Sequence, residues 1–212
     1  MEKQRKSFSR EGPEQRRADL ILATLDLIGE SGFNSATVRA ISVRAEVTQG
    51  LIRHYFSTKE DLINAAYAHH MSEMTGQGLL LDHDPAASAL VQLRNIVVAN
   101  LTAPVLDEKN LVLWASFIGK IRNEPGIRDT HKQTYLQFRE GLQECIAAAL
   151  HEAGRDPSET ECRRLAIACN AQIDGLWMEG CSISVEFSTD EIVEIGLASI
   201  GALLGLDLKD AA

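Results

Sequence analysis

TVRAISVRAEVTQGLIRHYFSTKEDL, residues 37–62, is the stretch that predicts the fold of this chain. Thr37 is placed to cap one helix of about two turns, and Thr48 is placed to cap a second helix that ends near Tyr55. The turn between these helices contains Glu46. Because two helices this short are marginal on their own, we expect them to pack against a longer neighbour.

Residues 14–30 are predicted to form that neighbour. Their apolar side chains recur with helical spacing, and Gly32 follows as a left-handed stop. The core shared with the two short helices is expected to contain Val38, Ile41, Val47, Ile52 and Phe56. Three helices arranged in this way form a helix-turn-helix domain, which we place at residues 14–60.

The second short helix carries polar residues on one side. At about 100° per residue, Gln49, Gly50, Arg53 and His54 share an arc, and Ile52 and Tyr55 lie opposite. In a DNA major groove, glutamine can pair with adenine edges and arginine with guanine edges. Gly50 would bring the backbone close to DNA, and a packing role for this glycine fits the sequence equally well.

A further helix is expected to begin at Ser57, because Ser57 and Glu60 have the S-x-x-E spacing of a capping box. Its N-terminus can anchor a DNA phosphate beside the second short helix, which we call the reading helix. Lys59 would add positive charge there, although it can also be read as an ordinary surface lysine. The residues that we expect to contact DNA are Thr37, Arg39, Thr48, Gln49, Gly50, Arg53, His54, Tyr55 and Lys59.

The formal net charge of -9 is unevenly distributed. Residues 1–60 carry 10 basic and 8 acidic side chains, whereas residues 61–212 carry 11 and 22. A slightly basic N-terminal part and an acidic remainder are expected where only the N-terminal part contacts DNA phosphates. Residues 1–13 are predicted to be a flexible basic arm, which either follows the DNA or is a solvated tail.

Several classes of protein find no support in the sequence. Without a run of 18 or more apolar residues or a signal peptide, the chain is expected to be cytoplasmic, with no membrane partner. Its four cysteines contain no CxxC pair and its six histidines no HExxH array, so we expect no metal and no cofactor. No phosphate loop, nucleophile elbow or dinucleotide fingerprint occurs, so we propose no catalytic residue and expect no enzyme.

Residues 14–67 closely resemble the DNA-binding domain of the TetR family of bacterial repressors, above all through ATVRAISVRAEVTQGLIRHYFSTKEDLI. Arg53 departs from the family pattern, because many relatives have tyrosine there, so the bases that are read cannot be carried over. The residues that match the pattern are Val47, Thr48, Gly50, Ile52, Tyr55, Phe56 and Lys59.

The rest of the chain is also predicted to be helical, giving an all-α fold of about nine helices. The expected helices beyond residue 57 end near Met74, Pro104, Asn123, Gly154, Gly180 and Gly205. Capping boxes at Ser158 and Ser188 open the last two helices. The final helix is apolar almost all round and rich in small residues, so it cannot face water on any broad side.

The TetR resemblance implies that the last two helices pair with those of a second subunit. A homodimer of this kind would grip a palindromic operator with its two reading helices. Residues 61–212 are therefore expected to bind an effector and to dimerise. The helix from about residue 57 to residue 74 joins this domain to the DNA-binding domain. We expect this helix to act as a lever that transmits the effect of the effector to the DNA-binding domain.

LVLWASFIGKIRNEP and AQIDGLWMEG, residues 111–125 and 171–180, resemble the BetI-type repressors, the choline-responsive regulators within this family. Trp114, Phe117, Asp174 and Trp177 could form a quaternary-ammonium site, because indole faces attract a cation and a carboxylate balances its charge. The alternative is that the aromatic residues are core packing and the aspartate is a surface residue.

The sequence thus predicts a ligand-responsive repressor that a small-molecule effector releases from DNA by shifting populations between two states. Two alternatives of the same fold stay open. One is a transcriptional activator or co-regulator, and the other is a helical interaction module that binds no specific DNA sequence.

Overall fold

The computed structural model describes residues 12–80, 86–183, 186 and 188–210. Within these ranges the chain folds into nine α-helices and one short 3-10 helix without a strand, which confirms the predicted all-α class. It divides into two compact units, the first ending at Ala66 and the second beginning at Tyr67. The predicted basic arm of residues 1–13 lies, except for its last two residues, outside the described part.

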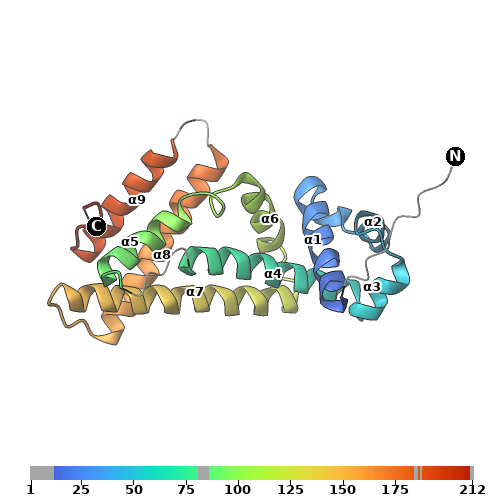
Figure 1. The fold of residues 1–212 in the computed structure, drawn as a ribbon, viewed down its shortest axis with the longest axis horizontal. Helices are drawn as coiled ribbons and strands as arrows, with labels where there is room; N and C mark the ends of the chain where they lie inside the picture. Colours follow the sequence, from blue (N-terminus) through green and yellow to red (C-terminus); the bar gives the residue numbers. More distant parts are fainter. Residues whose placement is uncertain (1–11, 81–85, 184–185, 187, 211–212) are drawn as a thin grey trace. The chain divides into compact units, whose positions relative to one another are not determined.

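The first unit contains the three helices predicted for the helix-turn-helix domain (Figure 1). Helix α1 spans Pro13–Ser31, a 3-10 turn covers Phe33–Ser35, and α2 and α3 span Val38–Arg44 and Gln49–Tyr55. Their shared core is fully or almost fully buried and consists of Leu20, Ile21, Ile28, Ile41, Ile52, Phe56 and Leu62. Val38 and Val47, also expected there, are only half-buried.

Helix α4, Lys59–Leu80, begins in the first unit and continues into the second. Its predicted capping box was placed one residue too early. The backbone N–H of Asp61 donates to Thr58 Oγ1 over 3.0 Å, and the backbone N–H of Thr58 donates to Asp61 Oδ2 over 3.0 Å. The reciprocal pair is therefore Thr58 with Asp61 instead of Ser57 with Glu60, because the carboxylate of an aspartate at the third helical position can reach back to the cap.

Helix α4 also extends beyond its predicted end near Met74. Gly76 and Gly78 lie inside the helix, where Gly78 allows close packing against α5, Ala89–Asn100. Asn100 Nδ2 donates to the carbonyl of Gly78 over 3.0 Å, and a β-carbon at residue 78 would lie 2.5 Å from Asn100 Oδ1. Glycine is thus required by this helix contact rather than by a turn.

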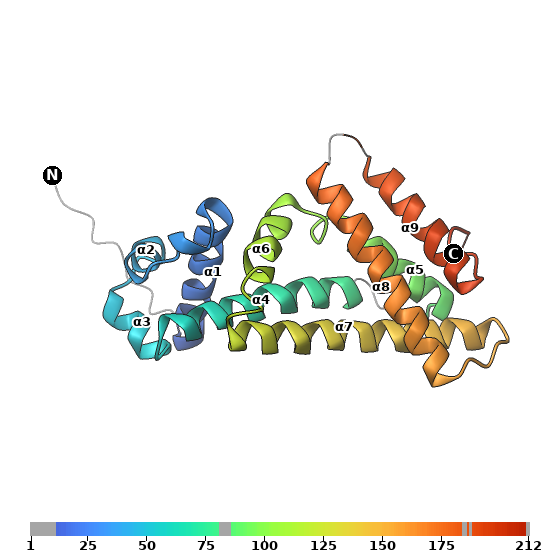
Figure 2. The ribbon, with the colours of Figure 1, turned by 180° about the vertical axis from the view of Figure 1, so that it is seen from behind.

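The second unit is completed by four further helices, which Figures 1 and 2 show from opposite sides. They are α6 at Glu108–Ile118, α7 at Pro125–Glu152, α8 at Glu159–Ser182 and α9 at Thr189–Leu204. Helix α6 ends before the predicted Asn123 because the chain changes to tighter turns there, with Lys120 N bonded to the carbonyl of Phe117. Ser158 and Ser188 cap α8 and α9 as predicted, accepting from the backbone N–H of Glu161 and Glu191.

Helices α8 and α9 lie side by side in both views, and α7 packs against α5 and α8. Their buried residues form one apolar core that includes Leu93, Leu142, Ile146, Ile173 and Ile200. Among the described residues, no helix is both long and apolar enough to cross a membrane. The same residues contain no group of three potential metal-ligating side chains, and the four cysteines are free thiols.

Candidate DNA-reading surface and ligand cavity

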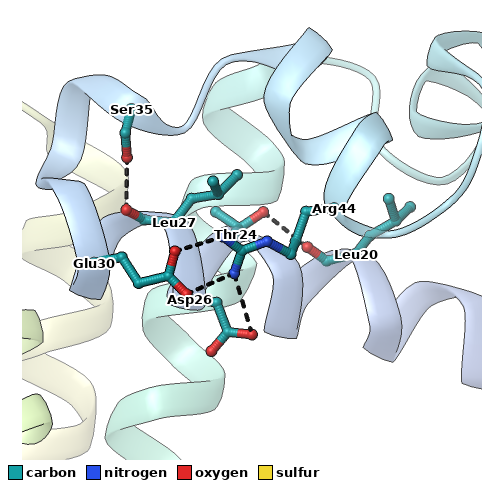
Figure 3. A network of polar contacts seen from close by, with 7 residues as sticks. All are labelled: Leu20, Thr24, Asp26, Leu27, Glu30, Ser35 and Arg44. Atoms are coloured by element: carbon teal, nitrogen blue, oxygen red, sulfur yellow. Dashed lines mark hydrogen bonds and ion pairs between the residues drawn. The ribbon is translucent and has the colours of Figure 1, made fainter.

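An ion pair joins α1 and α2 of the helix-turn-helix (Figure 3). Arg44 donates from Nη1 to Glu30 Oε1 over 2.8 Å and from Nη2 to Glu30 Oε2 over 2.5 Å, and its Nη1 lies 3.9 Å from Asp26 Oδ2. A bidentate arginine contact defines direction as well as distance, so this exposed pair adds to the apolar core in holding α2 against α1. In the same view Ser35 Oγ donates to the carbonyl of Leu27, which anchors the connecting turn to α1.

The turn between α2 and α3 has a left-handed residue at Glu46, whose φ is 53°. The backbone N–H of Val47 then donates to the carbonyl of Ser42 over 2.9 Å, which closes the turn. Thr48 begins α3 as its cap, accepting from the backbone N–H of Leu51 over 3.3 Å. Thr37 caps α2 in the same way, with the N–H of Ala40 as donor at 3.1 Å. Both predicted caps are confirmed.

This arrangement presents the polar arc of α3 to solvent. Ile52 is 2% exposed and holds the inner face of the helix in the core. Among the predicted DNA contacts, Tyr55 and Lys59 are half-buried. The remaining predicted contacts are all exposed: Thr37, Arg39, Thr48, Gln49, Gly50, Arg53 and His54.

Two ring contacts beside the reading helix were not predicted from the sequence. The rings of His54 and Tyr55 meet edge to face with their centroids 5.1 Å apart, and the guanidinium carbon of Arg17 lies 5.1 Å from the centroid of Phe56. The second contact ties the beginning of α1 to the end of α3. Only the tertiary packing brings Arg17 and Phe56 together, so no local sequence pattern indicates that pair.

The second unit contains a small cavity of about 70 Å³, and three of the four predicted ligand residues line it. Trp114 comes from α6, whereas Asp174 and Trp177 come from α8. The other lining residues are Met71, Met74, Thr75, Asn100, Val105, Tyr135, Phe138, Asn170 and Ile173. Asp174 is the one formally charged group in this set, so the lining favours a cation over an anion.

The two tryptophans form an edge-to-face pair with centroids 6.0 Å apart and an interplanar angle of 74°. Trp177 is 6% exposed, and its Nε1–H donates to the carbonyl of Val105 over 2.9 Å. Because this hydrogen bond fixes the indole plane, the ring is held in place without a ligand. Faces of fixed aromatic rings attract cations.

Asp174 is held by two donors that sequence reasoning missed. Tyr135 Oη donates to Asp174 Oδ2, and Asn170 Nδ2 donates to the same oxygen over 3.0 Å and to Tyr135 Oη over 2.8 Å. Burial raises the pKa of Asp174, and these two hydrogen bonds oppose the rise. The four-residue spacing of Asn170 and Asp174 on one helix could have indicated their contact, since residues at this spacing share a helix face.

Phe117, the fourth predicted ligand residue, does not line the cavity. It is fully buried, and its ring stacks on Tyr67 with centroids 4.4 Å apart. Trp114 and Phe117 are three residues apart on α6 and share a broad face of the helix, but Phe117 lies almost one turn farther along the axis, where it packs on Tyr67. The position of Phe117 is explained by core packing.

A helix-turn-helix with an exposed polar reading helix, joined to a helical unit with its own cavity, defines a helix-turn-helix transcriptional regulator. Residues 20–66 match the bacterial regulatory proteins of the tetR family, and residues 89–205 match the C-terminal domain of the BetI-type transcriptional repressors. The chain belongs to the TetR family and has a BetI-type C-terminal domain. It is accordingly a regulator and not an enzyme.

Curated relatives include the HTH-type transcriptional regulators BetI of Paraburkholderia phymatum and Burkholderia thailandensis. The first is 28% identical over 191 residues, which cover 90% of this chain and 94% of the relative. The second is 29% identical over 193 residues, again covering 90% of this chain and 94% of the relative.

Solved structures of the same fold include a transcriptional regulator from Pseudomonas aeruginosa PAO1. It has a TM-score of 0.81 and 28% identity, covering 98% of this chain and 99% of that one. A regulator from Saccharomonospora viridis, solved in complex with choline, has a TM-score of 0.70 and 20% identity, covering 88% and 96%. At that identity the second likeness concerns the fold alone.

Proposed function

We propose that the chain is a ligand-responsive repressor that binds a palindromic DNA operator as a homodimer and is released by a small cationic effector. The observation that carries this proposal is the exposed polar arc of α3, formed by Gln49, Gly50, Arg53 and His54. Polar residues concentrated on one face of a rigidly held short helix suit major-groove reading. Its action on chromosomal DNA would place the protein in the cytoplasm.

Gln49 and Arg53 are the proposed base-reading residues, since their side chains have bidentate geometry for adenine and guanine. Lys59 is the proposed phosphate contact at the beginning of α4. The cap at Asp61 places a carboxylate at that helix end and reduces its attraction for a phosphate. The positive charge of Lys59 therefore matters more here than the helix dipole does. Thr37, Arg39, Thr48, His54 and Tyr55 complete the proposed surface.

Dimerisation is proposed through α8 and α9, which present apolar side chains to solvent in the single chain. Met178 is 44% exposed on α8, and Ile195 and Leu203 are 40% and 45% exposed on α9. The exposed small residues among them, Ala171, Gly175, Ala198 and Ala202, would allow another helix to approach closely. A two-fold pairing of these faces would form a four-helix bundle and bring two reading helices to one operator.

The proposed effector is a small quaternary ammonium ion, with choline as the compound to test. The indoles of Trp114 and Trp177 supply aromatic faces, and Asp174 supplies the balancing charge. Within the described part of the chain, Asn170 Oδ1 is buried without a hydrogen-bond partner, so a ligand hydroxyl would find an acceptor near the cavity wall. The choline complex of the Saccharomonospora viridis regulator supports this choice.

Release would follow from a shift in population. A ligand that prefers the state with poor operator affinity lowers DNA binding by the ratio of its affinities for the two states. Helix α4 is the proposed lever, because it starts at the cap of Thr58 and also supplies Met71, Met74 and Thr75 to the cavity. Repression is proposed over activation because the C-terminal domain belongs to the BetI-type repressors.

The proposal is tested by fluorescence anisotropy with the DNA that flanks the protein's own gene. We expect sequence-specific binding with a steep salt dependence, which weakens when choline is added. Arg53→Ala should reduce the preference for the flanking DNA over random DNA. A salt-independent signal, or equal affinity for both DNAs with the unsubstituted protein, would indicate a helical interaction module instead.

A further inference from the structure

A continuous series of side-chain contacts joins the cavity to α4. The hydroxyl group of Tyr135 on α7 donates a hydrogen bond to Asp174. The ring of His131, one turn earlier on α7, stacks on Tyr135 with centroids 5.3 Å apart and an interplanar angle of 27°. The Nδ1 atom of His131 lies 2.8 Å from the hydroxyl oxygen of Tyr67 on α4. The contacts therefore pass from α8 through α7 to α4.

The hydrogen bonds in this series have defined directions. Because the carboxylate of Asp174 can only accept, Tyr135 must donate, and Asn170 Nδ2 donates in turn to the Tyr135 oxygen over 2.8 Å. Burial lowers the pKa of His131, which favours the neutral ring. A neutral His131 with its proton on Nε2 accepts at Nδ1 from the hydroxyl of Tyr67.

Tyr67 occupies a fully buried position on the lever helix. It is 0% exposed, and burial raises its pKa, so the hydroxyl remains protonated and available as a donor. A buried hydroxyl that loses its partner carries a desolvation cost. If His131 moves, Tyr67 must therefore move with it, or the desolvation cost of the unpaired Tyr67 hydroxyl opposes the movement.

A cation in the cavity acts directly on the other end of the series. Tyr135 and Asn170 both donate to Asp174 Oδ2, so a bound cation draws on the same carboxylate. Charge shared with a ligand weakens the hydrogen bonds that the carboxylate accepts from its other partners. Tyr135 is one of these partners, and its ring stacks on the ring of His131.

We infer that Tyr135, His131 and Tyr67 are positioning residues that couple occupancy of the cavity to the placement of α4. The inference rests on the proposed function, in which a cation in this cavity weakens operator binding. It assigns that coupling to two hydrogen bonds and one ring stack. Ordinary aromatic packing, such as the stack of Tyr67 on Phe117, would instead affect stability alone.

The first arm of the test needs no ligand. In protein labelled with ¹⁵N-histidine, we expect Asp174→Asn to shift the ring-nitrogen resonances of His131. The shift should be much smaller in the Tyr135→Phe background, because only the direct electrostatic effect of residue 174 remains there. Equal shifts in both backgrounds would overturn the inference, since Tyr135 would then transmit nothing.

The second arm uses choline as the probe and the full-length protein. For each variant we would measure choline affinity by tryptophan fluorescence, operator affinity without choline, and operator affinity at saturating choline. Tyr67→Phe keeps the ring and removes only the hydroxyl group. We expect its choline affinity without DNA and its operator affinity without choline to stay within about threefold of the unsubstituted protein. The factor by which choline lowers operator affinity should be at least about fivefold smaller in Tyr67→Phe than in the unsubstituted protein, since allosteric couplings are typically about 5–150-fold.

Phe117→Leu is the packing control, since it disturbs the ring face of Tyr67 and leaves the hydrogen bond to His131. We expect it to lower stability and to preserve the coupling. Undiminished coupling in Tyr67→Phe, or an equal loss in Phe117→Leu, would refute the assigned route. If choline fails to bind the unsubstituted protein, the proposed effector is wrong, and the ligand-free NMR arm decides the route by itself.

Discussion

Asn170 and Asp174 lie one helical turn apart on α8 and are joined by a hydrogen bond of 3.0 Å from Asn170 Nδ2 to Asp174 Oδ2. Burial raises the pKa of the carboxyl group, and the bonds from Tyr135 and Asn170 only partly offset this effect. Among the described residues, this part-buried carboxylate is held by the neutral donors Tyr135 and Asn170 and forms no ion pair. The cavity is therefore arranged at some cost to stability, and a cationic ligand would remove that cost.

Asp174→Asn should stabilise the ligand-free protein at pH 7 and abolish cation binding. The folded-state pKa of Asp174 is raised, so protonation favours the folded state at low pH, and that contribution is lost as the pH rises through the folded-state value. At pH 7 the ionised group opposes folding. We expect a gain of about 1 kcal/mol, or roughly 2–4 °C in Tm, measured by thermal unfolding.

The gain should shrink as the pH is lowered toward 4, because Asp174 becomes neutral in the unsubstituted protein as well. Glu179→Gln, at an exposed position on the same helix, is the matched control and should change Tm little. A lower Tm for Asp174→Asn at pH 7 would show that the hydrogen bonds outweigh the burial of the charge.

Tyr135→Phe should make choline affinity more sensitive to pH. Without the tyrosine hydroxyl, the pKa of Asp174 rises further, so the carboxylate is protonated at a higher pH and loses its attraction for the cation. We expect choline affinity to fall more at pH 6 than at pH 8, measured by titration calorimetry. The neutral isostere 3,3-dimethylbutanol is the control, and its affinity should change equally at both pH values.

The sequence was most informative where structure depends on neighbouring residues. The caps at Thr37, Thr48, Ser158 and Ser188 were all identified, because a capping side chain bonds to a backbone group three residues along. The cap of α4 was misplaced because Ser57 and Thr58 are both followed at that spacing by an acidic residue. Sequence spacing alone does not decide between them.

The cavity was only partly predictable for a physical reason. Trp114, Asp174 and Trp177 were chosen by chemical type, and the packing of α6 on α8 brings them together. The contact of Tyr135 with Asp174 depends on how α7 lies against α8. That relationship is tertiary, and no periodicity within one helix specifies it.

Thr58→Ala should destabilise the protein, whereas Ser57→Ala should not. The side chain of Thr58 accepts the backbone N–H of Asp61, and loss of such a cap costs about 1 kcal/mol. Ser57 is exposed and lies one residue before the cap, so its replacement should stay within about 0.5 kcal/mol. Urea unfolding of both variants measures the difference. A larger loss for Ser57→Ala would restore the cap that the sequence first indicated.

Ile195→Glu should convert the proposed dimer to monomers. The side chain is 40% exposed in the single chain and would be buried between α9 and its partner, where an unpaired carboxylate is costly. Sedimentation equilibrium should show a dissociation constant raised by at least about a hundredfold, as expected for a few kcal/mol. Gln137→Glu places the same charge at an exposed position on α7 and should leave the association unchanged. A dimeric Ile195→Glu would mean that another surface mediates assembly.

Arg53→Ala and Lys59→Ala should weaken DNA binding in distinguishable ways. Arg53 is exposed on the reading helix, so its loss should cost about 1–3 kcal/mol on the operator and relax the preference at one base position of each half-site. Lys59 lies at the first residue of α4, so its loss should weaken all sequences alike and reduce the salt slope by about one for each phosphate contact. Binding to a library of operator variants at several salt concentrations separates the two effects. Base preference unchanged by Arg53→Ala would remove this residue from the reading surface, and an unchanged salt slope in Lys59→Ala would leave it as an ordinary surface lysine.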